Sequence, residues 1–173
     1  MPETLRSTLG LTRALLRLCR GANIAAAAAF FLLLGLSFVR EDLFVQYYRT
    51  HMPGVDVQRL LPALRAMVLV GAPMFALVHA LLTRLLAMAE TVRDGDPFVP
   101  ENAERLRAVA WCLLMIQLLH MGFGVLAAQV RASGAPMEWE FPLAGWLAVL
   151  LTFVLAGVFR EGARLRGDLQ AMI

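Results

Sequence analysis

Four long runs of apolar residues, separated by shorter polar stretches, make up most of this chain. They cover residues 21–39, 66–87, 108–130 and 142–159, and none has a charged side chain in its central turns. The hydrocarbon core of a bilayer is about 30 Å thick, so a helix that rises about 1.5 Å per residue crosses it with about 20 residues. The pattern therefore predicts an all-α fold, a four-helix bundle with up-down topology that is embedded in a membrane.

A fifth, amphipathic helix is predicted ahead of the first run. Leucines recur at helical spacing along residues 4–20, and a separate stripe of arginines runs beside them. The stripe consists of Arg6, Arg13, Arg17 and Arg20. Such a helix either lies among anionic headgroups or serves only to anchor the topology. We therefore expect a cytoplasmic amphipathic segment, residues 1–20, and a four-span membrane domain, residues 21–173, with a cytoplasmic tail.

The arginines also orient the helices. All 16 basic residues are arginines, which together with abundant alanine and leucine is typical of a GC-rich bacterial genome. Eleven lie before the first run, around the middle connection or after the fourth run, and five lie in the other two connections. Positive residues accumulate on the cytoplasmic side of membrane proteins. Both termini and the middle connection are therefore predicted to be cytoplasmic, in a bacterial inner membrane.

The two remaining connections differ in length. The longer one, residues 40–64, contains Tyr47 and Tyr48, which suit the interfacial aromatic belt, and it is predicted to hold a short interfacial helix. The helical pattern resumes at Val57. The shorter one, residues 131–141, carries Trp139, which is also expected at the membrane interface.

No catalytic signature occurs in the chain. We find no G-x-S-x-G, H-E-x-x-H or Walker sequence, and every carboxylate lies in a connection or flank. With 60% hydrophobic residues and a mean hydropathy of +0.67, the 173 residues leave no room for a separate catalytic domain. A non-enzymatic protein is therefore expected rather than an enzyme, and no cofactor or metal is predicted.

The main polar side chains deep in the apolar runs are His79, Gln117 and His120, and Asn23 is a further one in the first run. His79 and His120 fall near mid-depth in neighbouring helices, so they are the candidates for a bis-histidine haem site if they meet. The simpler interpretation is a hydrogen bond between helices, worth about 0.6–2 kcal/mol. The same four residues would line the polar path if the chain were a small transporter or channel component.

The middle connection has the most distinctive sequence. Gly95 suits the end of one helix and Pro100 the first turn of the next, and Phe98 is placed to pack back against the bundle. Glu101, and Glu161 after the fourth run, predict a cluster of ion pairs that is either a structural clasp or a docking surface for a cytosolic protein. The arginines of this cluster are Arg105, Arg107, Arg160 and Arg164.

Two stretches resemble a known family. GDPFVPENAERLRAVAW and VFREGARLRGDL are similar to the G-x-P-F…N…L-R turn and V-F-x-E-G…L-R…D tail of a bacterial four-helix membrane family, domain of unknown function 2975. The matching positions are Gly95, Pro97, Phe98, Asn102, Leu106 and Arg107, then Val158, Phe159, Glu161, Gly162, Leu165, Arg166 and Asp168. The resemblance implies the fold and topology but no activity, although pairing of relatives with small helix-turn-helix regulators points to regulation.

The leading functional expectation is a non-enzymatic inner-membrane protein that acts as a sensor or regulatory partner. A small transporter or channel component and a haem-binding redox protein are the alternatives. The expected partners are the lipid bilayer, a second copy of the chain and a cytosolic regulatory protein, with no direct contact to nucleic acid. The predicted interaction surface comprises Gly95, Pro97, Phe98, Glu101, Asn102, Arg105, Arg107, Arg160, Glu161 and Gly162.

Overall fold

The computed structural model describes residues 3–93 and 97–170, and every regular element within them is an α-helix. The helices are α1 (Glu3–Val39), α2 (Glu41–His51), α3 (Val57–Arg93), α4 (Pro100–Ala132) and α5 (Leu143–Gln170). All but α2 are long and apolar enough to cross a membrane. The prediction of an all-α fold with four apolar helices is therefore confirmed, and α2 is the short helix expected in the longest connection.

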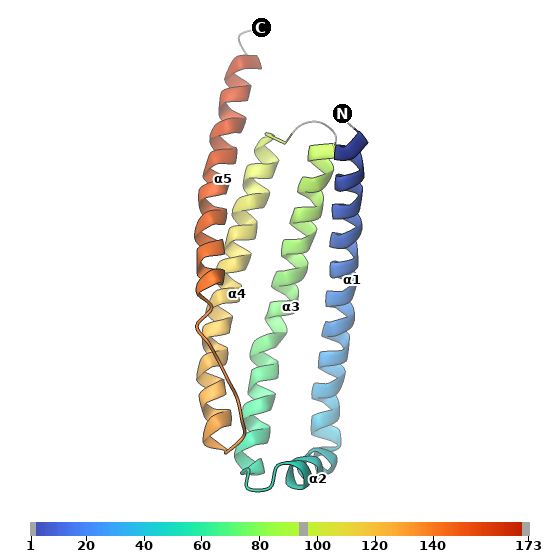
Figure 1. The fold of residues 1–173 in the computed structure, drawn as a ribbon, viewed down its shortest axis with the longest axis vertical. Helices are drawn as coiled ribbons and strands as arrows, with labels where there is room; N and C mark the ends of the chain where they lie inside the picture. The colour runs from blue at the N-terminus through green and yellow to red at the C-terminus, as the bar shows by residue number, and fades with distance from the viewer. Residues whose placement is uncertain (1–2, 94–96, 171–173) are drawn as a thin grey trace.

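The four long helices stand side by side in a row (Figure 1). α1 packs against α3, α3 against α4, and α4 against α5, and among the described residues no backbone contact joins α1 to α4 or α5. Neighbours in the row run in opposite directions. We call the end where α1 begins and α3 leads into α4 the N-terminal end, and the opposite end, where α2 links α1 to α3, the α2 end.

The N-terminal segment and the first apolar run form one helix. α1 continues without a break through Arg20 and Gly21. Arg13 turns toward α3, where its Nη2 donates a hydrogen bond to Glu90 Oε1 at 3.2 Å, while Leu11 faces outward. One member of the arginine stripe therefore holds α1 against α3.

A glycine in α3 lets three helices approach one another. A Cβ atom at Gly71 would lie 3.1 Å from the Phe123 ring of α4 and 3.4 Å from the Phe30 ring of α1. Because interiors are closely packed, a larger residue would push these rings apart. The main buried core lies between α3 and α4 toward the α2 end, and consists of Leu60, Ala63, Met67, Ala127, Val130 and Ala135.

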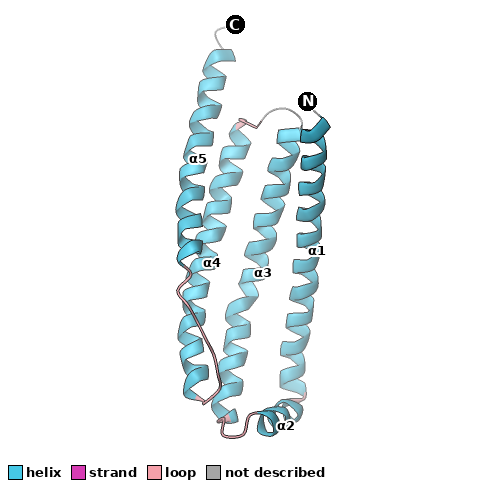
Figure 2. Cartoon of the chain, in the orientation of Figure 1, coloured by secondary structure: helices cyan, strands magenta, loops and turns pink. Residues whose placement is uncertain are grey.

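The connection after α4 turns back along the bundle as an extended segment before α5 begins (Figures 1 and 2). Its side chains alternate between two faces. Ala135, Met137 and Trp139 pack against the core, whereas Glu138 and Glu140 are exposed. Side chains of a β-strand with one buried face alternate in the same way, although the described chain contains no strand with which this segment could pair.

Trp139 fixes this extended segment against the side of α4. Its ring N–H donates to the backbone carbonyl of His120 at 3.3 Å, and its ring occupies the space beside Gly124, where a Cβ atom would lie 2.8 Å away. His120 is twelve residues before the end of α4, which is about 18 Å along the helix. α5 therefore starts beside the middle of α4 and projects past the N-terminal end (Figure 1).

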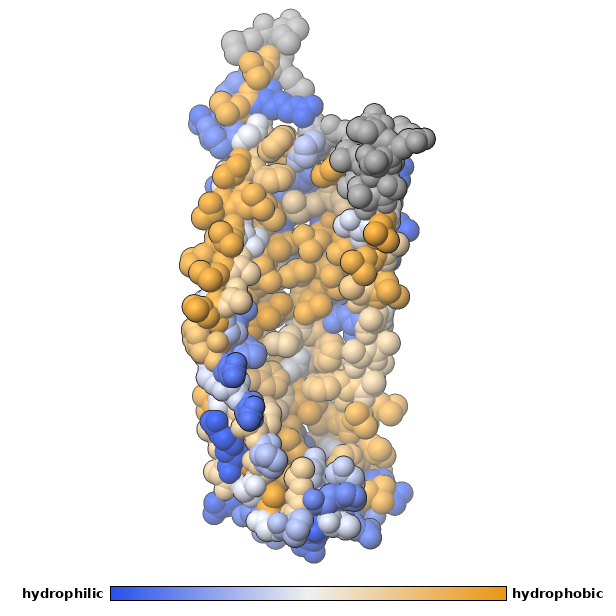
Figure 3. Space-filling model, viewed as in Figure 1, coloured by the Kyte–Doolittle hydropathy of each residue, from blue (hydrophilic) through white to orange (hydrophobic). Residues whose placement is uncertain are grey.

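Most of the surface between the two ends is apolar. On the face drawn in Figure 3, hydrophobic side chains cover much of the middle of the molecule, and hydrophilic ones gather at the ends and along the lower part of one side. The outer helices of the row expose large apolar side chains, such as Leu32 of α1 and Leu151 of α5. Lipid tails are as apolar as leucine, so such exposure is the state expected of helices in a bilayer.

Candidate functional site

A buried asparagine organises the N-terminal end of the bundle. Asn102, in the first turn of α4, is 0% exposed. Its Nδ2 donates to Thr91 Oγ1 of α3 at 2.7 Å and to the carbonyl of Pro97 at 3.0 Å, and its Oδ1 accepts from Arg105 Nη1 at 2.9 Å. Because a buried amide is stable only when its hydrogen bonds are made, this arrangement fixes how α3, the connection and α4 meet.

Phe98 joins the middle connection to α5. Its ring lies 5.2 Å from the ring of Phe159, centroid to centroid, and a Cβ atom at Gly162 would lie 2.8 Å from Phe98 Cδ1. Phe98 therefore packs back against the bundle, as predicted, and the helix that it contacts is α5. The two stretches that carry the family resemblance touch each other here. We call Phe98, Asn102, Phe159 and Gly162 the junction.

Within the part of the chain that the structure describes, Glu101 and Glu161 do not form the ion pairs that were expected to bridge the junction. Glu161 pairs with Arg164 at 2.9 Å, one turn along α5, and both side chains are mostly exposed. Among the described residues no ion pair joins Glu101 to α5, and Arg105 donates to Asn102 instead. The contact of Phe98 with α5 is therefore made by aromatic packing, without help from Glu101 or Glu161.

The remaining residues of the predicted surface are spread around the same end. Arg107, Arg160 and Glu101 are exposed to solvent, and Pro97 is half-buried. Gly95 lies outside the described residues. The structure therefore brings together, at one end of the molecule, the members of the predicted surface that it describes.

The two candidate histidines lie at different levels. Counting along antiparallel α3 and α4 from the Thr91–Asn102 hydrogen bond, His79 is level with residue 114 and His120 with residue 73. A stagger of six residues is about 9 Å along the helices. The His120 ring packs instead against Trp139, with centroids 5.9 Å apart. Within the described chain no group of three or more His, Cys, Asp or Glu side chains is placed to hold a metal ion.

The other polar side chains of the apolar runs belong to separate helix contacts. Asn23 of α1 donates from Nδ2 to the carbonyl of Phe75 in α3 at 3.0 Å. Gln117 of α4 is buried under Gly145 of α5, where a Cβ atom would collide with its amide, and its Oε1 accepts no hydrogen bond. The four polar residues are therefore divided among the helix contacts, and the described structure does not gather them along one path.

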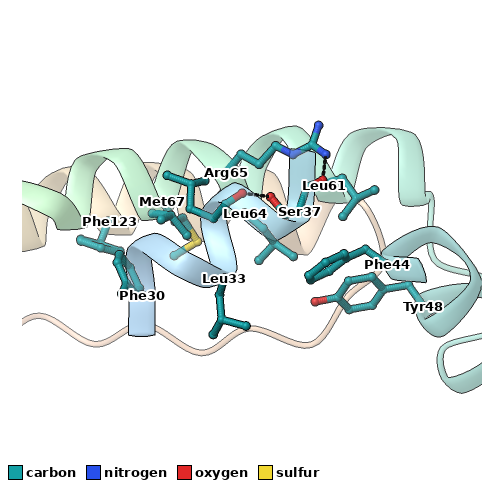
Figure 4. A pocket seen from close by; sticks show the side chains of 12 residues that line it. Phe30, Leu33, Ser37, Phe44, Tyr48, Leu61, Leu64, Arg65, Met67 and Phe123 are labelled. Atoms are coloured by element: carbon teal, nitrogen blue, oxygen red, sulfur yellow. Dashed lines mark hydrogen bonds between the residues drawn. The ribbon is translucent and has the colours of Figure 1, made fainter. Parts of the chain in front are cut away.

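A cavity of about 300 Å³ lies at the α2 end, between α1, α2 and α3. Figure 4 shows the rings of Phe44 and Tyr48 from α2 at one end of it, and those of Phe30 and Phe123 at the other. Its walls are almost entirely apolar. Burial raises the pKa of the Tyr48 phenol above its usual range. We call this cavity the α2-end pocket.

Arg65 of α3 is the charged residue in the wall of the α2-end pocket. Its Nη2 donates to the backbone carbonyl of Ser37 and to Glu41 Oε2, the latter at 2.9 Å. The guanidinium also lies over the Phe38 ring, 4.3 Å from its centroid, and Nε is buried without a hydrogen-bond partner. Arg65 therefore ties α3 to the end of α1 and the start of α2.

Sequence reasoning did not identify the α2-end pocket. Its walls come from four helices, so no short motif carries it. The available signals were Arg65 at the edge of an apolar run and Tyr48 in the interfacial helix. Neither residue type predicts a cavity without knowledge of how α1, α2 and α3 pack.

Comparison with known proteins places the chain in a family. Neither the curated proteins nor the solved structures gave a match. One family profile, described as "Protein of unknown function (DUF2975)", matches residues 40–173. The match begins directly after α1, includes both stretches that meet at the junction, and covers more than half of the chain. The chain therefore belongs to the DUF2975 family, as its two motif stretches predicted.

Proposed function

We propose that this protein is a non-enzymatic sensor or regulatory partner in a bacterial inner membrane, and that it acts on a cytosolic protein through its N-terminal end. The observation that carries the proposal is the contact of Phe98 with Phe159 and Gly162. This contact ties the α3–α4 connection to the projecting part of α5. A change in how α3, α4 and α5 pack would therefore move the exposed surface around the junction as one body.

The arginine distribution supports a cytosolic position for this end. Eleven of the 16 arginines belong to the segments that meet at or near the N-terminal end, and such residues are retained on the cytoplasmic side during insertion. On this orientation the projecting end of α5 and the middle connection are open to soluble proteins. The α2 end then faces the other side of the membrane.

The exposed groups around the junction indicate what kind of partner would bind. Arg107 and Arg160 are exposed, and Phe98 keeps 40% of its surface accessible. Arginines and aromatic side chains are enriched where proteins bind one another. An acidic surface on a cytosolic protein, with an apolar patch to cover Phe98, would complement this end.

Photocrosslinking in living cells tests the proposal. A benzophenone amino acid is placed at Arg107 or Arg160, and at two control positions, Leu150 on the apolar face and Arg49 at the α2 end. We expect a discrete adduct with a cytosolic protein from Arg107 and Arg160 only, and loss of that adduct when Phe98→Ala is added. An adduct that forms equally from Arg49, or no adduct from either Arg107 or Arg160, would contradict the proposal.

A further inference from the structure

We propose that the α2-end pocket binds the alkyl chain of an amphiphile whose uncharged, oxygen-bearing head lies beside α2. The chemistry is shared by a free fatty acid in its protonated form and by the acyl ester of a phospholipid. The inference uses neither the junction nor a cytosolic partner, so it stands or falls separately from the proposed function.

The walls of the α2-end pocket favour an alkyl chain over water. A buried water needs two to four polar partners, and the interior presents side chains such as Leu33, Leu64 and Val68. The volume of about 300 Å³ is at the lower end of the range of about 300–1,000 Å³ for ligand pockets. A pocket of this size suits one chain and is too small for both chains of a lipid.

The position of the pocket sets the direction of the chain. The rings of Phe30 and Phe123 close its inner end, well inside the apolar runs of α1 and α4. α2, which has no buried residue and carries exposed charges such as Glu41 and Arg49, bounds the other end. A chain in this pocket would therefore run parallel to the helices, with its head among the polar groups of α2, as in a lipid leaflet.

The polar groups at the α2 side select an uncharged head. The Tyr48 hydroxyl points from α2 toward the middle of the pocket (Figure 4), and among the described residues none accepts a hydrogen bond from it. A phenol is protonated at neutral pH, so the Tyr48 hydroxyl can donate a hydrogen bond. The charge of Arg65 is already balanced by Glu41, so the pair offers little net attraction to an anion. A carbonyl or carboxylic oxygen that accepts from Tyr48 fits these groups.

Photolabelling of the purified full-length protein in phosphatidylcholine vesicles tests this inference. Two probes are used, a palmitic acid with a diazirine in its chain and a phosphatidylcholine with the same acyl chain. We expect label from at least one probe to concentrate on peptides that contain the pocket walls of α1 and α3. Labelling by the fatty acid alone identifies a free acid as the ligand, and labelling by the phospholipid probe identifies a membrane lipid.

Two adjacent substitutions on α3 provide the matched control. Val68→Phe fills the pocket and should abolish the concentrated label, whereas Leu69→Phe, on the exposed neighbour, should leave it unchanged. Tyr48→Phe should weaken competition by the unlabelled form of the probe about 2- to 10-fold, which is the effect of losing one hydrogen bond. Tyr47→Phe should leave this competition unchanged. Label spread evenly over lipid-facing helices such as α5, or equal labelling of Val68→Phe and the parent, would overturn the inference.

Discussion

At the scale of single residues, Asn102 shows what a motif position can mean physically. The sequence identified it through its family resemblance and placed it on the predicted surface. The structure shows it completely buried, with its amide shared between Thr91, Pro97 and Arg105. This role could not be predicted from spacing alone, because Thr91 lies on the preceding helix and meets Asn102 only when α3 and α4 pack.

Asn102→Ala should therefore destabilise the protein. The change removes a fully buried amide and its hydrogen bonds to the half-buried Pro97 carbonyl and Thr91 hydroxyl, which costs about 1–3 kcal/mol in free energy of unfolding. Denaturant titration of the detergent-solubilised protein measures this loss. Glu104→Ala, an exposed position in the same helix, should change the free energy by about 0.5 kcal/mol or less. Equal stability of the two variants would show that the asparagine network contributes little.

In contrast, Glu101 and Glu161 lack, among the described residues, the contacts that the sequence led us to expect. Glu101 and Glu161 were expected to bridge the two motif stretches through arginines. The structure pairs Glu161 with Arg164 on one helix, in a solvent-exposed geometry whose typical worth is about 0–1 kcal/mol. Opposite charges near one another in sequence predict that pairs will form. They do not predict which pairs, because long side chains on a surface have several partners within reach.

At the scale of elements, the apolar runs predicted the long helices well, and the packing between elements was predicted less completely. The course of the chain after α4 was missed, although Ala135, Met137 and Trp139 alternate with Glu138 and Glu140. Alternation of apolar and polar residues over so few positions is weak evidence for an extended segment by itself. Its meaning depends on Gly124, which leaves room for the Trp139 ring on α4.

The contact between the middle connection and α5 gives an element-scale prediction. Gly157→Ala, where nothing lies within 4 Å of the new Cβ, should stabilise α5 by about 0.5–1 kcal/mol through helix propensity. Gly162→Ala should lack this stabilisation or should destabilise the protein, because the new Cβ would collide with the Phe98 ring. Unfolding free energies of the two variants make the comparison.

A double-mutant cycle isolates the cause. In a Phe98→Ala background the obstacle is gone, so Gly162→Ala should become as favourable as Gly157→Ala. If Gly162→Ala is already as stabilising as Gly157→Ala with Phe98 present, then Phe98 does not pack on α5 as described.

At the scale of the whole molecule, the helices form a row whose two outer members, α1 and α5, each pack against one long neighbour. Sequence patterns predicted four apolar helices but could not predict this arrangement, because lipid and protein neighbours are equally apolar and favour the same residues. The row places the junction at one end and the α2-end pocket at the other. The proposed function therefore depends on which end faces the cytoplasm.

Cysteine accessibility in intact cells measures that orientation most directly. In a Cys19→Ser background, which leaves only the buried Cys112, Arg160→Cys marks the N-terminal end and Arg49→Cys, on α2, marks the α2 end. With a membrane-impermeant maleimide, we predict labelling of Arg49→Cys in intact cells and of Arg160→Cys only after the inner membrane is permeabilised. Labelling of Arg160→Cys in intact cells, with Arg49→Cys protected, would contradict the account.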